Sequence, residues 1–424
     1  MRILFVYPNL NKQLTPQIGI TSLVACLRDK HDIAFFDFSL IKNREIEEFT
    51  DTIVEFHPDV VLFSCRTMEW DCVKNMAKIS FPTPVIVGGI HPTVDPEEVI
   101  KHVNILVRGE GEETIVELLD KMSQGKDITS VANVWVRQKG KVYRNEVRPL
   151  IKDLDKLPFP EWRVFDQLHY NKSYIRNLYP WIECVGAFES TRGCPFSCTY
   201  CCNDYLQTLY KGKGSYHRRK SPGRVAHEVK LFKHFYPHCN FVYFVDDTFM
   251  VDEDWLKDFS KLYDKTPFVF MTRVEMVTEK KMQMIAEMGG KSVSMGIESG
   301  NEKFRKEVLK RNMSQEQIIK AFKIAKDYGL KVYSFNMVGL PYETVSDIQS
   351  TIDLNQKVKP DIAQFTVFYP FVGTKLFDIC VKEGYLKGKI TPHANYYDFS
   401  VLDLPNFQKG EITKWVLEAR RKCN

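Results

Sequence analysis

Residues 190–203 read S-T-R-G-C-P-F-S-C-T-Y-C-C-N, and this stretch organises the rest of the chain. Its first three cysteines, Cys194, Cys198 and Cys201, stand at spacings of four and three residues. Residues three and four apart share one face if the loop coils helically, so three thiolates can surround one corner of an iron–sulfur cube. A complete cysteine-ligated cluster takes four cysteines. The spacing therefore predicts a cluster whose fourth iron is open to a ligand that is not protein.

Structural zinc is the alternative interpretation of these cysteines. Structural zinc sites favour four closed protein ligands, commonly arranged as paired C-x-x-C groups. The sequence contains no second pair, and Cys202 is expected to point away from the other three. The eleven cysteines show no regular pairing, which favours a reducing cytoplasm over a disulfide framework. Ordinary buried or stray thiols are expected at Cys26, Cys72, Cys239, Cys380 and Cys423.

Length and composition exclude several other classes of protein. The chain has 424 residues, enough for two domains, and its 44% apolar content is typical of a globular protein. The net charge is +5, and no basic run is longer than residues 217–220, so nucleic-acid binding is not indicated. No window approaches eighteen uninterrupted apolar residues, and the apolar run at the start is too short for a signal peptide.

The C-x-x-x-C-x-x-C loop, with Tyr200 before its last cysteine, resembles that of the radical S-adenosylmethionine (SAM) enzymes. In that family the open iron of a [4Fe–4S] cluster binds the amino and carboxylate groups of SAM. An electron then splits SAM into methionine and a 5′-deoxyadenosyl radical. The resemblance implies that Cys194, Cys198 and Cys201 hold such a cluster.

Residues 1–147 alternate strand-like and helix-like segments. Apolar runs of strand length occur at residues 3–7, 33–36, 60–64, 85–88 and 105–107, and residues 131–147 alternate like a hairpin. This pattern predicts a doubly wound, Rossmann-like α/β domain with a parallel sheet. Ligands of such domains bind at the carboxyl ends of the strands.

The loops at those strand ends resemble the cobalamin-binding domain that precedes many radical SAM barrels. The pieces G-G-x-H-P-T at residues 88–93 and R-G-E-G-E at residues 108–112 carry most of the resemblance. It implies that cobalamin is bound by residues of these loops and of the loop after the third strand: Ser64, Arg66, Thr67, Trp70, Gly88, Gly89, His91, Gly109, Glu110 and Gly111.

The loop after the first strand departs from the pattern of many cobalamin domains. Methyl-transferring and mutase domains often carry D-x-H-x-x-G there, whose histidine binds cobalt, but residues 8–12 contain no histidine. The lower face of cobalt is therefore expected to have no histidine ligand. Arg66 or Trp70 is expected below cobalt without binding it. The alternative is that Arg66 pairs with a propionamide or an acid and that Trp70 belongs to the core.

Residues 148–183 read as a linker, and residues 184–380 as a second domain. Strands are expected at residues 186–190, 241–245, 268–273, 292–296, 332–337 and 363–368, with a helix after each of the first five. Six such units fit the partial (β/α)6 barrel of the radical SAM family, whose active site lies at the carboxyl ends of its strands. A short C-terminal segment, residues 381–424, completes the chain, and its helix lies over the barrel or packs outside it.

Several segments at the predicted strand ends resemble the SAM-binding segments of the family. Asp246 and Asp247 end the second strand and are expected to hold the amino group of SAM. Glu298, in G-I-E-S-G, is expected to accept the ribose hydroxyls, and Arg273 to pair with the SAM carboxylate or form a salt bridge. Gly339, in G-L-P-x-E-T, is expected beside adenine. No residue is assigned a catalytic role.

The resemblance implies a cobalamin-dependent radical SAM methyltransferase that acts on an unactivated carbon through methylcobalamin. The alternatives are a relative that cyclises, oxidises or rearranges its substrate, and a non-catalytic cobalamin or redox sensor. A transfer-RNA methylthiotransferase would need a second set of cysteines and a basic C-terminal module, and neither is present. The expected partners are a small-molecule or peptide substrate and an electron donor such as flavodoxin or ferredoxin.

Overall fold

The computed structural model describes residues 1–42, 44–173, 181–386 and 398–424, and the chain divides into two compact units. Unit 1 comprises residues 1–181 and 205–215, and unit 2 comprises residues 182–204 and 216–424. The expected linker, residues 148–183, falls almost wholly within unit 1, apart from residues 174–180, which lie outside the described residues.

Unit 1 is built on a seven-stranded sheet with the order β2-β1-β3-β4-β5-β6-β7. The first five strands are parallel, and the β6–β7 hairpin continues the sheet in antiparallel fashion. The predicted doubly wound domain is confirmed, and the order of its parallel strands is that of flavodoxin-like folds, with the switch point between β1 and β3. The strands are β1 Arg2–Tyr7, β2 Asp32–Asp37, β3 Val60–Ser64, β4 Val85–Gly88, β5 Ile105–Val107, β6 Val134–Gln138 and β7 Lys141–Arg144.

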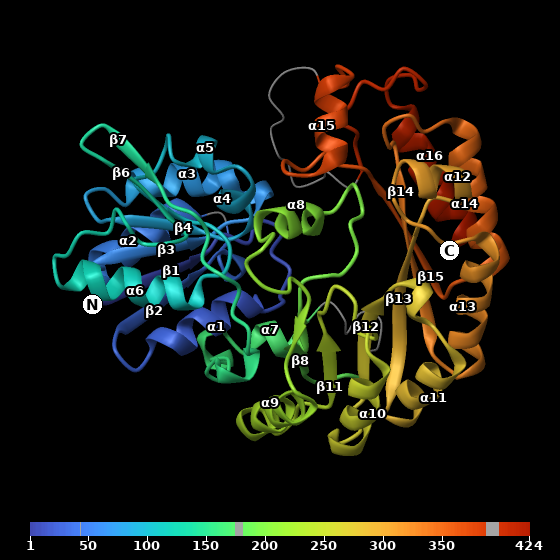
Figure 1. Ribbon diagram of the computed structural model, residues 1–424, viewed down its shortest axis with the longest axis horizontal. Coiled ribbons are helices and arrows are strands. Elements are labelled where there is room, and N and C mark those ends of the chain that lie inside the picture. Colours follow the sequence, from blue (N-terminus) through green and yellow to red (C-terminus); the bar gives the residue numbers. More distant parts are fainter. Residues whose placement is uncertain (43, 174–180, 387–397) are drawn as a thin grey trace. The chain divides into compact units, whose positions relative to one another are not determined.

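Helices cover both faces of this sheet (Figure 1). One face packs on α2, α3 and α5 through a core that includes Phe49, Phe63 and Trp70. The other face is covered by α1 and α6, and by Phe165 of the expected linker, whose ring packs edge-on against Tyr7. The helices are α1 Ile18–Leu27, α2 Glu45–Phe56, α3 Trp70–Ile79, α4 Ile90–Val94, α5 Pro96–Val99, α6 Glu112–Ser123 and α7 Leu168–Asn171.

Unit 2 contains six parallel strands in the order β15-β14-β13-β12-β11-β8, so each strand pairs with its neighbours along the chain. The two edge strands, β8 and β15, do not pair with each other, and the predicted partial (β/α)6 barrel is confirmed. The strands are β8 Val185–Phe188, β11 Phe241–Phe244, β12 Phe268–Thr272, β13 Gly290–Glu298, β14 Lys331–Val338 and β15 Ile362–Val367; a short ribbon pairs β9 Thr191–Arg192 with β10 Arg218–Arg219.

Most helices of unit 2, among them α9, α10, α11, α13 and α14, run along the outer side of the strands, and α8 begins in unit 2 but ends in unit 1 (Figure 1). Their starts are fixed by side-chain caps, for example Ser314 with Gln317 at α13 and Thr344 with Asp347 at α14. The helices are α8 Cys202–Leu209, α9 Pro222–Phe235, α10 Glu253–Leu262, α11 Glu279–Glu287, α12 Glu302–Glu307, α13 Gln315–Asp327, α14 Val345–Val358, α15 Lys375–Lys382 and α16 Glu411–Cys423.

The C-terminal helix α16 packs on the outside of the barrel. Ile412, Val416 and Ala419 join a core formed with the outer faces of β14 and β15 and with α14. The side chain of Asn424 bonds both the amide and the carbonyl of Ala363 in β15. Of the two roles considered for this helix, packing outside the barrel is the one observed. No helix in the described ranges is both long and apolar enough to cross a membrane.

Candidate active site

The cysteine loop of unit 2 leaves the carboxyl end of β8, and after the two-residue strand β9 it has no helix or strand until α8 begins at Cys202. Cys194 and Cys198 are buried and Cys201 is partly buried, and none of the three is in a disulfide. Gly193 enters the loop with φ +77°, and a Cβ there would lie 2.5 Å from the carbonyl oxygen of Tyr216. This close approach requires glycine at the position before the first cysteine.

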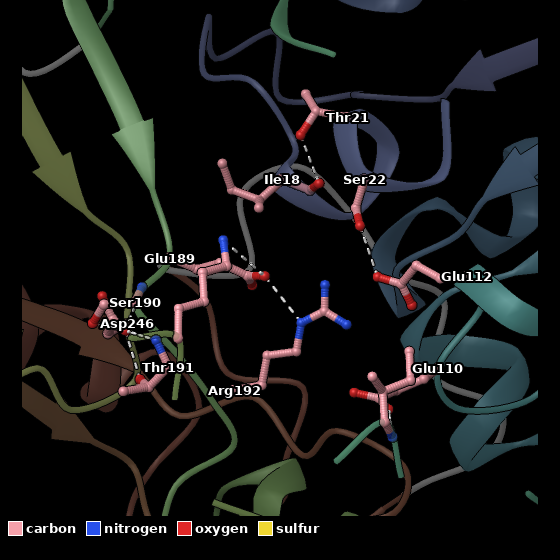
Figure 2. Close-up of polar contacts among 12 residues, drawn as sticks. Ile18, Thr21, Ser22, Glu110, Glu112, Glu189, Ser190, Thr191, Arg192 and Asp246 are labelled. Atoms are coloured by element: carbon pink, nitrogen blue, oxygen red, sulfur yellow. Dashed lines mark hydrogen bonds and ion pairs between the residues drawn. The ribbon is translucent and has the colours of Figure 1, made fainter. Parts of the chain in front are cut away.

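A buried carboxylate holds the entrance of the loop. Oδ1 of Asp246 accepts hydrogen bonds from the backbone amides of Ser190 and Thr191, at 2.9 and 2.5 Å, and from both hydroxyls (Figure 2). Its second oxygen, Oδ2, is buried without a hydrogen-bond partner among the described residues. Burial raises the pKa of Asp246 to about 6. Asp246 therefore supports the loop rather than facing an open cavity.

Asp247, by contrast, is exposed. Its Oδ2 accepts a hydrogen bond of 3.1 Å from Nδ2 of Asn203, and the same nitrogen lies 3.4 Å from Sγ of Cys201. Tyr216 donates to the Asn203 side-chain oxygen at 2.6 Å and so fixes its orientation. Of the two aspartates predicted to contact SAM, Asp247 is the one with an accessible carboxylate next to a cysteine ligand.

Each of the three thiols has different polar neighbours. Sγ of Cys194 lies 3.6 Å from the hydroxyl of Thr248, and Cys201 has the Asn203 amide. Cys198 is contacted by two guanidinium groups, with Nη1 of Arg273 at 3.0 Å and Nη1 of Arg311 at 3.9 Å from its sulfur. Positive charge therefore gathers on one of the three predicted ligands.

Cys202 was expected to point away from the three predicted ligands, but its thiol contacts that of Cys201. Its thiol shares a hydrogen bond with Cys201, and this bond, more than burial, raises the pKa of Cys201. Among the described residues, no group of three or more Cys, His, Asp and Glu side chains is arranged to hold a metal ion. In a [4Fe–4S] cluster each cysteine binds a different iron, so this finding concerns sites for a single ion.

Glu298 ends β13 in a strained conformation. Its φ is +66°, in the left-handed region that residues other than glycine rarely adopt, and the strand register shifts between Gly296 and Glu298. The carboxylate folds back over Gly296, where a Cβ would lie 2.1 Å from Oε1. Tyr200 of the cysteine loop donates to Oε1 at 3.1 Å, and burial raises the pKa of Glu298. Strain at a buried carboxylate is typical of functional sites.

Two other residues predicted to contact SAM have structural partners. Arg273 forms an ion pair with Glu275, with Nη2 and Oε1 2.5 Å apart, and its guanidinium lies 3.8 Å from the ring centre of Phe196. Gly339 has φ +83° and packs against Ile412 of α16. Glu343 caps this turn by accepting from the Gly339 amide at 2.6 Å.

In unit 1, the loops after β3 and β4 are joined through their backbones. The Cys65 amide donates to the carbonyl of Gly88 at 2.8 Å, and the His91 amide donates to the carbonyl of Cys65 at 3.1 Å. Gly89 has φ +105°, and a Cβ there would lie 2.7 Å from that Cys65 carbonyl. Glycine is therefore required by the contact between the two loops themselves.

The loop after β5 is held by the segment that follows the cysteine loop. Residues 205–215 belong to unit 1, and the Tyr210 hydroxyl accepts from the Glu110 amide at 2.9 Å. Gly109 has φ +74°, and a Cβ there would lie 1.8 Å from that hydroxyl oxygen. Farther along, Glu112 accepts from Ser22 at 2.8 Å and so ties α6 to α1, as Figure 2 shows.

The remaining residues predicted to bind cobalamin lie at the carboxyl edge of the sheet or just beneath it. Ser64 ends β3, Thr67 begins a short 3-10 turn, and Gly111 precedes α6. Arg66 bonds Glu69 and, at 3.2 Å, Oδ1 of Asn9. Its side chain is 43% exposed, so it remains accessible to a ligand.

His91 and Trp70 are buried and pack against each other, with their ring centres 5.2 Å apart. Both ring nitrogens of His91 and Nε1 of Trp70 lack hydrogen-bond partners among the described residues. Burial lowers the pKa of His91 to about 4. Trp70 belongs to the core of unit 1, which is the alternative considered for it above. Arg66 pairs with an acid, Glu69, as its alternative also has it, but its side chain stays accessible.

Sequence reasoning missed Arg311, Asn203 and Tyr216, all of which approach the cysteine loop. Asn203 lies in the first turn of α8 and Tyr216 follows that helix, and neither had a motif to mark it. Arg311 lies between α12 and α13, 113 residues after Cys198. No motif in the sequence marks Arg311, and its burial is seen only in the structure.

Comparisons with known proteins agree with this architecture. Residues 188–354 match the model of the radical SAM superfamily, and residues 11–119 match the model of the B12 binding domain. An uncharacterised methyltransferase of Pyrococcus horikoshii is 28% identical to the chain, over 99% of this chain and 91% of its own length. An anaerobic magnesium-protoporphyrin IX monomethyl ester cyclase of Rubrivivax gelatinosus is 24% identical, over 89% of this chain and 69% of its own length.

A solved structure shares the fold. The radical SAM methyltransferase TsrM from Kitasatospora setae, with cobalamin and a [4Fe–4S] cluster bound, superposes with a TM-score of 0.71 at 14% identity, covering 90% of this chain and 75% of that one. The fold and the matched models define a B12 binding domain followed by a radical SAM domain. One chain therefore carries both a match to the B12 binding domain and a match to the radical SAM superfamily.

The assignment of the iron ligands predicts a clear difference between neighbouring cysteines. Replacing Cys194, Cys198 or Cys201 with alanine should abolish iron binding, because each removes one of only three protein ligands. Cys202→Ala should keep the iron. The measurement is iron content and visible absorbance after anaerobic reconstitution. Loss of iron from Cys202→Ala, with iron retained in Cys201→Ala, would show that the adjacent thiol is the true ligand.

Proposed function

We propose that this chain is a cobalamin-dependent radical SAM methyltransferase that acts on an unactivated carbon of a small molecule or peptide. The observation that carries the proposal is a loop of three reduced cysteines, buried or half-buried, whose Tyr200 bonds the strained carboxylate of Glu298. Three cysteines leave one iron of a [4Fe–4S] cluster without a protein ligand. When bound, SAM at that iron supplies the deoxyadenosyl radical, and cobalamin supplies the methyl group.

The polar residues around the thiols suit the groups of SAM. The exposed carboxylate of Asp247 can accept charge-assisted hydrogen bonds from an ammonium group. It lies near Cys201, because the Asn203 side-chain amide contacts both residues. The Glu298 carboxylate can accept hydrogen bonds from both ribose hydroxyls, as a carboxylate has two oxygens to offer. Arg273 offers donors for the SAM carboxylate on the side of Cys198, although Glu275 already neutralises its charge. We assign Gly339 to the turn beside adenine.

The carboxyl edge of the parallel sheet in unit 1 suits a large ligand. Glycines at positions 88, 89, 109 and 111 add no side chains of their own there, and the loops are braced from within, in part by Tyr210 against Gly109. The loop after β1, residues 8–12, contains no histidine, so we assign no imidazole to the lower face of cobalt. Arg66 is the accessible residue at the end of β3 and is our candidate for that face.

A second reaction class has specific support. The Rubrivivax gelatinosus relative is a cyclase, so a ring closure without methyl transfer is possible on this architecture. Both reactions need a hydrogen atom removed from a carbon and an electron supplied to the cluster. We therefore propose a one-electron donor of the flavodoxin or ferredoxin type as a partner in either case.

One experiment separates the two reactions. The full chain is reconstituted anaerobically with iron, sulfide and hydroxocobalamin, reduced with dithionite, and incubated with methyl-deuterated SAM and a metabolite extract. Mass spectrometry should find deoxyadenosine together with a product that carries the deuterated methyl group. Deoxyadenosine with an unlabelled product would support the non-methylating alternative. An absence of deoxyadenosine from a protein that holds its cluster would contradict both.

The role assigned to Glu298 predicts a loss of SAM affinity. Glu298→Ala should weaken SAM binding by about 10- to 100-fold, because a hydrogen bond to a charged group contributes about 1.5–3 kcal/mol. Equilibrium dialysis with labelled SAM on the reconstituted protein measures this. Glu302→Ala, four residues away at the start of α12, is the control. Unchanged affinity, or loss of iron instead of SAM, would contradict the ribose assignment.

The glycine loops of unit 1 predict a selective loss of cobalamin. Gly109→Ala combines left-handed strain with a clash against Tyr210, so the loop has to move. Gly125→Ala is a matched control, because its φ of +63° imposes similar strain but nothing lies within 4 Å of the added carbon. Cobalamin retained after gel filtration, measured by its visible absorbance, should fall several-fold in Gly109→Ala alone. Equal retention in the two variants would count against a cobalamin site at this loop.

A further inference from the structure

Arg311 lies in the loop between α12 and α13, and its side chain is 5% exposed. Its guanidinium donates to the Tyr200 hydroxyl at 3.0 Å and to the carbonyl of Gly296 at 2.6 Å. Nη1 also lies 3.9 Å from Sγ of Cys198 and 3.9 Å from Oε1 of Glu298. One side chain therefore contacts the cysteine loop and the end of β13 together.

The loop that carries Arg311 is fixed against the cysteine loop. The Thr199 hydroxyl donates to the carbonyl of Val308 at 2.7 Å, and the Thr199 amide donates to the carbonyl of Leu309 at 3.2 Å. The fully buried Arg305 braces the loop by donating to the carbonyls of Ser299 and Met313. The position of the Arg311 guanidinium beside Cys198 is thus built into the fold.

The charge of Arg311 is poorly balanced by the described protein groups. A guanidinium stays protonated in proteins, and a buried cation is costly without an anion. Arg311 donates to a phenol and a carbonyl, and it pairs only at 3.9 Å with the carboxylate of Glu298, whose pKa is raised by burial. Arg273 differs, because Glu275 pairs with it directly. Of the two cations at Cys198, Arg311 is the one whose charge is available to another anion.

We propose that Arg311 is the built-in counter-cation of the cluster and raises its reduction potential through Cys198. The inference rests on the proposed function, since it assumes a cluster on Cys194, Cys198 and Cys201. Reduction adds one electron from an external donor and makes the cluster one unit more negative, with no bond formed or broken. A fixed positive charge and hydrogen bonds to a ligand sulfur both favour the reduced form. Arg311 is therefore a positioning and potential-setting residue.

The test is the reduction potential of the reconstituted full chain without SAM. Dithionite and low-potential mediators set the potential, and electron paramagnetic resonance measures the reduced cluster. In Arg311→Gln, reduction should be about tenfold less favourable, which corresponds to a potential about 59 mV lower for a one-electron couple. Arg311→Lys keeps the charge and should shift this equilibrium by less than about threefold. Lys310→Gln, which removes an exposed positive charge from the same loop, is the control and should shift it by less than about twofold.

The experiment distinguishes failure of the role inferred for Arg311 from failure of the proposed function. A wild-type chain that takes up no cluster contradicts the proposed function itself. If the wild-type chain takes up a cluster and Arg311→Gln has the same reduction potential, the proposed counter-cation role of Arg311 is wrong. If Arg311→Gln does not fold or hold iron, Arg311→Lys decides. A potential close to wild type in Arg311→Lys supports the role of charge, and a full tenfold shift, or loss of the cluster from folded Arg311→Lys, overturns it.

Discussion

Between β9 and α8 the cysteine loop contains no helix or strand, so its shape depends on side-chain contacts. Asp246 gathers four hydrogen bonds at the entrance, and Thr199 and Arg311 join the middle of the loop to residues 308–313. Each of these contacts joins parts of the chain at least 55 residues apart. The loop can therefore form only once the strands of the barrel are in place. The arrangement of the predicted ligands depends on the folding of unit 2 as a whole.

Much of the fold could be predicted from the sequence because the strands are buried on both faces. Parallel strands of that kind appear as short, continuous apolar runs, and the runs at residues 60–64 and 268–273 coincide with β3 and β12 apart from one residue. The residues of the site divide differently. Glu298 could be found because its glycine neighbours form a local pattern. Arg311 and Asn203 could not, since their significance lies in contacts with residues that are distant or that carry no motif.

The glycine-rich loops of unit 1 show how a correct pattern can have a second cause. Their glycines suggested room for a large ligand, yet Gly89 is needed by the Cys65 backbone and Gly109 by Tyr210. Likewise, His91 stands in a distinctive motif but is buried against Trp70. Internal packing and ligand binding are compatible, because loops that brace one another also present a rigid backbone. The sequence alone does not separate these two demands.

The strain at Glu298 and the buried charge of Arg311 have a common explanation. A left-handed carboxylate residue and a cation without a close counter-ion both cost stability, and neither improves the packing of the barrel. The Tyr200 hydroxyl bonds both Glu298 and Arg311, and Tyr200 lies between the predicted iron ligands Cys198 and Cys201. A protein retains such costs where they serve a ligand that is negatively charged on one side and rich in hydroxyls on the other. A cluster beside an adenosyl ribose has that character, which supports our proposal that Cys198, Tyr200 and Glu298 lie at the reacting end of the barrel.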